Sequence, residues 1–179
     1  MAHYQQQQYV ASIKQKYPNF FKNSRVLDVG SLDINGNNRE FFENSIYTGL
    51  DIAPGRNVDI VCKAHEYISD EKYDTVISTE CLEHDKFYAL TLNNCAQLLK
   101  SGGLFLFTCA TTGRPEHGTR KSDVVSSPLT CQIEDWADYY KNITEEDVRK
   151  VLAVDQLFTT YEFSVGNETH DLYFYGIRR

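Results

Sequence analysis

Two acidic residues, each at or next to the end of an apolar run, are the side chains whose spacing most clearly predicts chemistry. Asp28 lies in the run 25–29 just before Gly30, and Asp51 follows the next run, 46–50, about 20 residues later. A glycine lets a ligand approach the backbone closely, and an acid after the second run can accept hydrogen bonds from ribose hydroxyls. This order indicates a nucleoside-binding α/β domain.

A second group of residues could move a proton. Glu83 and His84 follow the apolar run 73–78, and His117 lies in a later polar segment. Because histidine changes charge near neutral pH, we expect His117 or His84 to act as a general base, with Glu83 as the third candidate. The alternatives are that His84 only fixes its loop by bonding the backbone and that His117 binds substrate. Two further histidines are expected at the surface: His3 and His170.

The composition is that of an ordinary globular protein of 179 residues, 41% hydrophobic and 24% charged, which we expect to form one domain. The net charge of −7 argues against a nucleic-acid partner and favours a small neutral or cationic substrate. We expect no membrane contact, because no apolar run has the length of a membrane span. The cysteines are odd in number and form no Cys-x-x-Cys pair, which argues against zinc and disulfides and favours the cytoplasm: Cys62, Cys81, Cys95, Cys109 and Cys131.

Seven short runs must position these residues. The first five are almost continuously apolar, as buried parallel strands are, and a turn joins the last two, which predicts an antiparallel pair. The runs are 25–29, 46–50, 58–61, 73–78, 104–109, 157–165 and 171–178. Residues 52–57 are too few for a crossover helix, so one helix of the wound sheet is expected to be missing. Helices are predicted within 1–22 and at 86–100, the second ended by Gly102 and Gly103.

Residues 24–110 resemble the core of a class I S-adenosylmethionine-dependent methyltransferase of the small-molecule methyltransferase-domain type. The segments that carry the resemblance stand in the family's order: Val-Leu-Asp-Val-Gly at 26–30, Asp51, Asp-Ile-Val-Cys-Lys-Ala-His at 59–65, Tyr-Asp-Thr-Val-Ile-Ser-Thr-Glu-Cys-Leu-Glu-His at 73–84, and Leu-Leu-Lys-Ser-Gly-Gly-Leu-Phe-Leu-Phe at 98–107. Two positions depart from the pattern. Leu32 stands where a second glycine is usual, and Lys63 stands where an acid often contacts the adenine amino group.

The resemblance implies an α/β, Rossmann-like fold with a mostly parallel seven-stranded sheet and a C-terminal antiparallel hairpin. It also implies S-adenosyl-L-methionine as cofactor and S-adenosyl-L-homocysteine as product. The single domain 1–179 would contain an N-terminal helix (1–22), a cofactor-binding core (24–110), a substrate-side loop (110–143) and a C-terminal helix and hairpin (144–179). The residues expected to bind the cofactor are Asp28, Gly30, Ser31, Asn35, Gly36, Asp51, Ile52, Ala64, His65, Thr79 and Glu80. The alternatives are that Asp28 only caps its turn and that Glu80 is a solvated carboxylate at a helix start.

The long polar segment 110–143 suits a hydroxylated acceptor, so we expect O-methylation of a sugar or a similar small metabolite. The residues expected to bind the acceptor are Arg114, Glu116, Trp136, Tyr139 and Tyr140. For the three aromatic residues, the alternative is a hydrophobic cluster beneath the loop. Other functions left open are a catalytically silent cofactor-binding module and, less favoured, an NAD-dependent dehydrogenase. No metal site is predicted, because no residues have the spacing of metal ligands, but a metal-assisted methyltransferase is a further alternative, since carboxylates and histidines lie near the expected site. The sequence does not indicate an oligomeric state.

Overall fold

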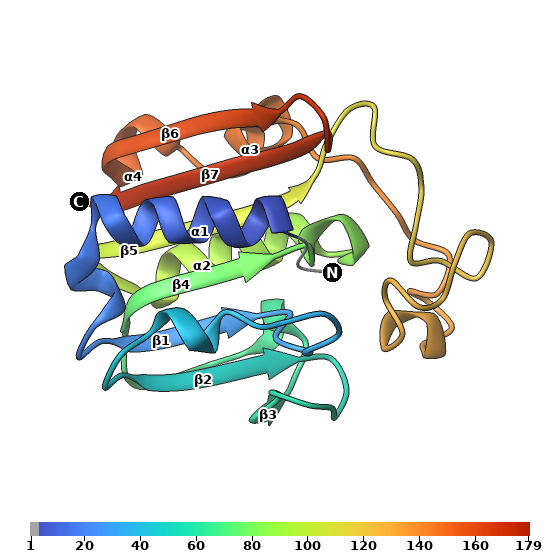
Figure 1. The fold of residues 1–179 in the computed structure, drawn as a ribbon, viewed down its shortest axis with the longest axis horizontal. Coiled ribbons are helices and arrows are strands. Elements are labelled where there is room, and N and C mark those ends of the chain that lie inside the picture. The colour runs from blue at the N-terminus through green and yellow to red at the C-terminus, as the bar shows by residue number, and fades with distance from the viewer. Residues whose placement is uncertain (1–3) are drawn as a thin grey trace.

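The structure is a computed structural model that describes residues 4–179. His3, which was expected at the surface, lies outside the described residues. A seven-stranded sheet in the order β3-β2-β1-β4-β5-β7-β6 forms the centre of the fold (Figure 1). Its strands are β1 (Arg25–Val29), β2 (Ile46–Asp51), β3 (Ile60–Val61), β4 (Tyr73–Thr79), β5 (Leu99–Ala110), β6 (Phe158–Gly166) and β7 (Asp171–Arg178). All seven predicted strands are present, which confirms the predicted sheet.

Strand pairing places the end of β1 at the centre of the carboxyl edge. β1 pairs in parallel with β2 on one side and with β4 on the other, and β3 and β5 extend the parallel part. β7 runs antiparallel to both β5 and β6, which confirms the predicted hairpin. Because the strand order reverses between β1 and β4, their carboxyl ends flank the place where ligands bind in open α/β sheets.

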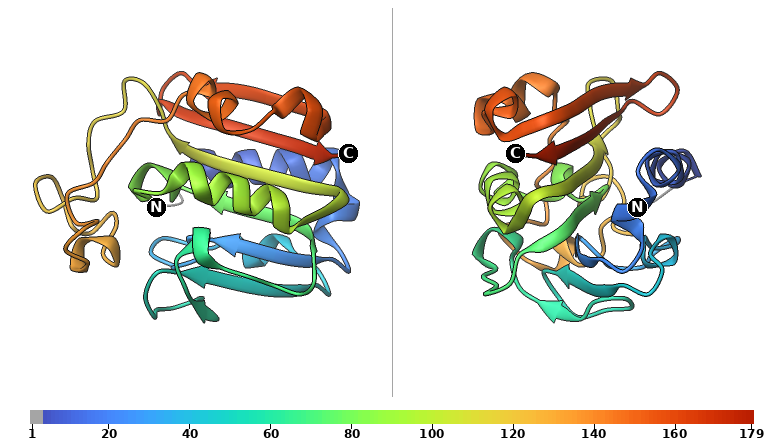
Figure 2. Two further views of the ribbon diagram at one scale, coloured as in Figure 1. Left: turned by 180° about the vertical axis from the view of Figure 1, so that it is seen from behind. Right: turned by 90° about the vertical axis from the view of Figure 1, so that its left-hand side faces the viewer.

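Helices cover both faces of the sheet. On one face lies α1 (Tyr4–Lys16), and on the other lie α2 (Tyr88–Leu98), α3 (Glu145–Val151) and α4 (Val154–Leu157) (Figure 2). Val10 and Ile13 of α1 are buried in one apolar cluster, and Leu92 of α2 and Val148 of α3 are buried in a second, larger one. Burial of these two clusters is the main force that holds the layers together.

The end of α2 differs from the prediction. The helix ends at Leu98 rather than at residue 100, and β5 begins at Leu99. Leu99 is paired with Tyr73 of β4, and both side chains are buried. Gly102 and Gly103, which were predicted to end the helix, therefore lie within β5, where Gly102 has a φ of +78°. The predicted helix end was wrong, because an apolar residue such as Leu99 fits a buried strand as well as a helix.

The crossover connections are shorter than in a regular wound sheet. The predicted absence of a helix between β2 and β3 is confirmed. In addition, β1 and β2 are joined through a single 3-10 turn, Arg39–Phe41, and β3 and β4 through another, Ala64–Glu66. The structure therefore lacks an α-helix at three crossovers, two more than the prediction, and the loop after β1 must be held by its own polar contacts.

The segment between β5 and α3 lies beyond the carboxyl ends of the parallel strands, where its yellow-to-orange trace stands apart from the sheet (Figure 1). Its regular structure is limited, among the described residues, to the 3-10 turn Thr130–Gln132. α3 then begins with a capping box, in which Thr144 and Asp147 exchange hydrogen bonds. Within residues 4–179, no helix is both long and apolar enough to cross a membrane.

Candidate active site

A cavity opens at the carboxyl ends of β1, β2 and β4, next to the reversal of strand order. It contains about 840 Å³, including its mouth. Its walls come from the turn after β1, the residues 62–64, the loop after β4 and the segment 126–130. The cavity thus lies where the sequence analysis placed a nucleoside site.

The turn after β1 brings its backbone against the loop after β4. Gly30 has a φ of +80°, and a Cβ here would lie 2.4 Å from the Cβ and 2.5 Å from the Sγ of Cys81. Glycine alone fits both the backbone angle and the space. Burial raises the pKa of the Cys81 thiol well above its ordinary value. A thiol that stays protonated is a poor nucleophile, so Cys81 serves here as a packing residue against Gly30.

Asp51 holds the same turn from the end of β2. Its Oδ2 accepts a hydrogen bond from the backbone N–H of Leu32 at 2.9 Å, and its Oδ1 accepts one from Ile52 at 2.7 Å. Leu32 stands in place of the family's second glycine and does not have a positive φ. Its side chain packs over Gly55, where an added Cβ on Gly55 would lie 2.2 Å from the Cδ1 of Leu32. Each carboxylate oxygen has two lone pairs, so Asp51 keeps acceptor capacity toward the cavity.

Asp28 connects four parts of the site. Its carboxylate accepts hydrogen bonds from the Tyr47 hydroxyl at 2.5 Å and from the Asn38 amide at 3.3 Å. The same Asn38 amide donates to the Thr79 hydroxyl at 3.1 Å. Burial raises the pKa of the Asp28 carboxyl to about 6. Asp28 lines the cavity and also fixes the loop after β1 through Asn38.

Residues 62–64 form the wall expected to face adenine. The Lys63 ammonium pairs with Glu66 at 3.3 Å. The Ala64 carbonyl accepts a hydrogen bond from the Asn94 amide at 2.7 Å, which fixes this short turn against α2. A ligand at this wall therefore meets backbone at Ala64 and the start of the Lys63 side chain.

All but two of the predicted cofactor residues line the cavity. Asn35 is exposed, in the turn that the hydrogen bond from the Gly36 N–H to Asp33 closes. His65 packs on the ring of Phe87, with 4.5 Å between ring centroids, and does not line the cavity. These two predictions lack structural support. The lining residues on the predicted list are Asp28, Gly30, Ser31, Gly36, Asp51, Ile52, Ala64, Thr79 and Glu80.

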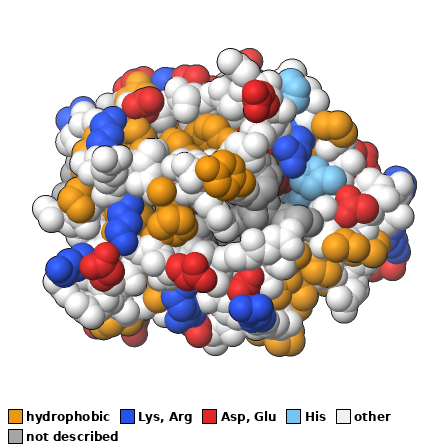
Figure 3. Space-filling view, in the orientation of Figure 1, with side chains coloured by type: hydrophobic (Ala, Val, Ile, Leu, Met, Phe, Trp, Pro, Cys, Tyr) orange, Lys and Arg blue, Asp and Glu red, His pale blue; other side chains and the backbone are white. Residues whose placement is uncertain are grey.

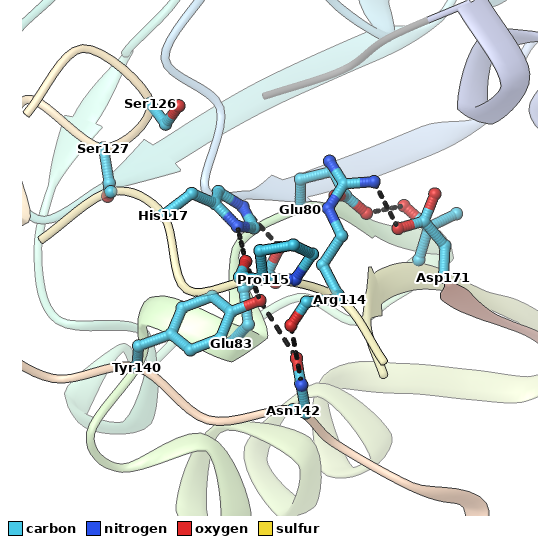
Figure 4. Close-up of polar contacts among 12 residues, drawn as sticks. Glu80, Glu83, Arg114, Pro115, His117, Ser126, Ser127, Tyr140, Asn142 and Asp171 are labelled. Atoms are coloured by element: carbon cyan, nitrogen blue, oxygen red, sulfur yellow. Dashed lines mark hydrogen bonds and ion pairs between the residues drawn. The ribbon is translucent and has the colours of Figure 1, made fainter. Parts of the chain in front are cut away.

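His117, from the loop after β5, comes together with the adjacent residues Glu83 and His84, the other two candidates for moving a proton. Glu83, His84 and His117 each present a polar atom within 4.8 Å of the other two (Figure 4 labels Glu83 and His117). Glu83 is 0% exposed and His84 is 3% exposed, and His84 also lines the cavity. Burial raises the pKa of Glu83 well above its ordinary value and lowers the pKa of His84 well below its own. Burial also lowers the pKa of His117. All three residues therefore favour their neutral forms, and a neutral histidine can accept a proton.

The orientation of His117 is set by its neighbours. Its Nδ1 lies 3.1 Å from the carbonyl oxygen of Pro115, a hydrogen-bond acceptor, so Nδ1 carries the proton in the neutral ring. The lone pair of Nε2 then faces Glu83, whose Oε1 is 4.0 Å away. Tyr140 also donates to the Pro115 carbonyl, at 3.2 Å, and its ring packs against His117 (Figure 4). This arrangement directs Nε2 toward Glu83.

The predicted acceptor-binding residues occupy different places. Trp136 lines the cavity, and Tyr140 contacts His84 and His117. Tyr139 is half-buried and does not line the cavity. Arg114 and Glu116 point elsewhere: the Arg114 guanidinium donates to the Thr169 carbonyl at 2.7 Å and lies 3.6 Å from Asp171, and Glu116 accepts from Thr119 at 2.7 Å. Those two side chains hold the loop and do not reach the cavity.

Several lining residues were not predicted. Asn38 is a buried amide whose partners lie on β1 and β4, and its only sequence signal was its place in a polar turn. Asp85 accepts from the Phe87 N–H at 2.7 Å and from the Thr91 hydroxyl, and it follows directly after the motif that contains His84. The segment 126–130 lines the cavity from the opposite side through Ser126, Ser127, Pro128, Leu129 and Thr130. Nothing in its composition indicated which part of the loop would fold back.

The residues present fit S-adenosylmethionine. The close approach at Gly30 gives an uncluttered backbone turn for the amino-acid part, and the acceptor capacity of Asp51 suits ribose hydroxyls. The wall at 62–64 offers backbone and apolar surface to adenine. His84 lines the same cavity as Glu80 and Cys81.

Known proteins agree with this fit. A family model described as a methyltransferase domain matches residues 1–142. No curated protein matches the chain. Among solved structures, it is similar to the 1,6-didemethyltoxoflavin-N1-methyltransferase of Burkholderia thailandensis, with S-adenosylhomocysteine bound, at a TM-score of 0.64 and 14% identity over 95% of this chain and 76% of that one.

Two further structures, both with S-adenosylhomocysteine bound, show the same fold. The N-methyltransferase NodS of Bradyrhizobium japonicum has a TM-score of 0.61 and 13% identity, over 97% of this chain and 87% of that one. The magnesium protoporphyrin IX methyltransferase of Synechocystis has a TM-score of 0.61 and 16% identity, over 100% of this chain and 89% of that one. The chain belongs to the methyltransferase-domain family and is a class I S-adenosylmethionine-dependent methyltransferase.

Proposed function

We propose that this enzyme methylates a hydroxyl oxygen of a small polar acceptor, a sugar or another hydroxylated metabolite. The observation that carries the proposal is the meeting of Glu83, His84 and His117 at the edge of the cofactor cavity. A neutral hydroxyl is a weak nucleophile and gains from a proton acceptor, whereas a neutral amine already has a free lone pair. The neutral imidazoles of His84 and His117 can accept a proton, and such an acceptor is most useful when an oxygen is methylated.

His117 is the proposed base. S-adenosylmethionine, when bound, supplies a methyl group on a positively charged sulfur. The chain's part is to hold the acceptor in line with that group and to take its proton. The Nε2 lone pair of His117 can accept the hydroxyl proton, and the Pro115 carbonyl, which accepts from Nδ1, stabilises the charged ring that results. Asp51 and the turn at Gly30 would hold the cofactor, which would supply the methyl group that the oxygen receives.

The polarity of the site supports a hydroxylated acceptor. The carboxylates of Glu80 and Asp85 line the cavity, as do hydroxyl-bearing residues of the segment 126–130. These groups suit hydroxyls or a cationic acceptor better than an anionic one. On the face in Figure 3, basic and acidic side chains are interspersed, which supports the proposal of a small molecule rather than nucleic acid as substrate.

The cytoplasm is the proposed location. All five cysteines are free thiols in the structure, as in proteins of a reducing compartment.

An acceptor panel tests the function. The enzyme would be incubated with S-adenosylmethionine carrying a labelled methyl group and with sugars, nucleotide sugars, phenols and amines, and each product would be identified by its methyl NMR signal. We expect O-methyl products from the hydroxylated acceptors. Methylation of amines alone would show that the acceptor class is wrong. Tight binding of S-adenosylhomocysteine with no turnover on any acceptor would favour the catalytically silent alternative.

A further inference from the structure

The group of Glu83, His84 and His117 has a feature that general-base catalysis does not explain. Neither oxygen of Glu83 and neither ring nitrogen of His84 has a hydrogen-bond partner among the described residues. The N–H groups of Glu83 and Ala110 lie near the carboxylate, but neither makes a hydrogen bond of ordinary geometry. Glu83 and His84 are both almost fully buried. Buried polar groups without partners are costly, so such a group is expected to have a partner that the chain does not supply.

The surroundings of His117 match those of a metal ligand. A histidine that binds a metal through one ring nitrogen usually donates its other N–H to a carbonyl or carboxylate. Here Nδ1 faces the Pro115 carbonyl at 3.1 Å, and Nε2 faces Glu83 Oε1 at 4.0 Å with its lone pair. A lone pair and a carboxylate oxygen at this separation attract each other only through a shared proton or cation.

We propose that Glu83, His84 and His117 bind a divalent transition-metal ion at the acceptor end of the cavity. Two imidazoles and one carboxylate are a ligand set of zinc and non-haem iron sites, whereas magnesium and calcium prefer oxygen ligands. Ligand atoms on one ion with bonds of about 2.1 Å lie at most roughly 4.2 Å apart. The observed separations, all within 4.8 Å, therefore need only small side-chain rotations.

A metal site was not predicted from the sequence, because these ligands form no local motif: Glu83 and His84 are adjacent, but His117 belongs to a different loop. If the proposed function holds, the ion would acidify the hydroxyl of the acceptor, and His117 would act as a ligand in place of a base. Binding of the ion itself does not depend on that function.

Metal binding to the whole chain tests the proposal. Protein stripped with a chelator would be titrated with Zn²⁺, Co²⁺ and Mg²⁺ by calorimetry, and the Co²⁺ complex would be examined by visible absorption. We expect one Zn²⁺ or Co²⁺ per chain and no binding of Mg²⁺ at the same concentrations. His117→Ala and Glu83→Gln should each weaken Zn²⁺ binding by at least about 100-fold, since each removes one of three ligands.

Matched controls separate lost ligands from lost structure. His170→Asn and Glu168→Gln change an exposed histidine and an exposed glutamate in the turn between β6 and β7, and both should bind Zn²⁺ as the unchanged protein does. S-adenosylhomocysteine binding and thermal unfolding report whether each variant is folded. No Zn²⁺ or Co²⁺ binding by the unchanged protein, or equal binding by His117→Ala, would overturn the proposal. Metal binding without O-methylation would instead reject only the proposed function.

Discussion

The cofactor end of the cavity and the proposed acceptor end differ in how their buried polar side chains are hydrogen-bonded. At the cofactor end, Asp28 accepts hydrogen bonds from Tyr47 and Asn38, and Asp51 accepts two from backbone N–H groups. At the acceptor end, Glu83 and His84 are just as buried, but their polar side-chain atoms have no hydrogen-bond partner among residues 4–179.

From this difference we infer that the first end serves cofactor binding and the second serves methyl transfer. A buried polar group without a hydrogen-bond partner costs about 1–3 kcal/mol. The carboxylates of Asp28 and Asp51 have partners within the chain, so their hydrogen bonds can fix the cofactor end without a ligand. If a substrate or an ion binds at the proposed acceptor end, it can supply the partners that Glu83 and His84 lack within the described part of the chain. Changes at the first end should therefore affect cofactor binding and stability, and changes at the second should affect turnover.

The largest effect is expected at the acceptor end. His117→Gln keeps a polar side chain of similar length but removes the imidazole, as a base or as a metal ligand. We expect turnover to fall by about 10²–10⁴-fold, the usual contribution of a general acid or base. Calorimetry should show S-adenosylhomocysteine affinity unchanged within about twofold, because His117 does not line the cavity. A fall in affinity with turnover preserved would reverse the assignment of the two ends.

The next largest effect is expected at the cofactor end, from Gly30→Ala. The added Cβ would lie 2.4 Å from Cys81, at a φ of +80°. We expect S-adenosylhomocysteine binding to weaken by about 100-fold, because the turn must move. Gly102→Ala is the matched control: it has a φ of +78° but nothing within 4 Å of the added Cβ. It should cost about 1–2 kcal/mol of stability and leave binding intact, and equal effects of the two variants would refute the role of close approach.

Asp28→Asn tests the cofactor end through the pH dependence of the free energy of unfolding. Burial raises the pKa of Asp28 to about 6 from 3.8, so the folded protein binds this proton more tightly than the unfolded chain. The stabilisation is complete below pH 3.8 and is lost as pH rises to about 6, a change of up to about 3 kcal/mol. Denaturant unfolding at several pH values should show that Asp28→Asn removes this part of the pH dependence. An unchanged pH dependence would mean that Asp28 titrates normally.

The smallest expected effect is in the pH profile of turnover. Burial lowers the pKa of His117 and of His84, and a histidine accepts a proton only in its neutral form. We therefore expect kcat/KM to remain on its plateau below the ordinary histidine pKa of about 6.5 and to fall only at lower pH. A half-maximal value at or above pH 6.5 would contradict the burial of the working histidine.

The sequence predicted the cofactor end far better than the acceptor end. Asp51 and Gly30 follow strands whose apolar runs are plain, so their meeting at one edge of the sheet could be deduced. Asn38 was not predicted, because its role depends on hydrogen bonds to Asp28 and Thr79, which only the folded sheet brings close to it. His117 was predicted as a residue, but its contact with Glu83 depends on how a long loop without periodicity folds back.

Arg114 is the reverse case, a residue that was predicted for the site but whose side chain lies elsewhere. Its type and polar surroundings suggested an acceptor-binding residue, yet its guanidinium is used by Thr169 and Asp171 at the start of β7. The end of α2 was misplaced for a related reason. Leu99 pairs with Tyr73 of β4, a tertiary contact that the helical spacing of the local sequence does not reveal.

Calorimetric titration with S-adenosylhomocysteine tests the division between the two ends most directly. The protein would be compared with Asp51→Asn and Glu83→Gln, with thermal unfolding of each as a check of folding and NAD as a control ligand. We predict micromolar binding to the unchanged protein and to Glu83→Gln, a large loss in Asp51→Asn, and no binding of NAD. Equal losses in the two variants, or binding of NAD in place of S-adenosylhomocysteine, would contradict the account.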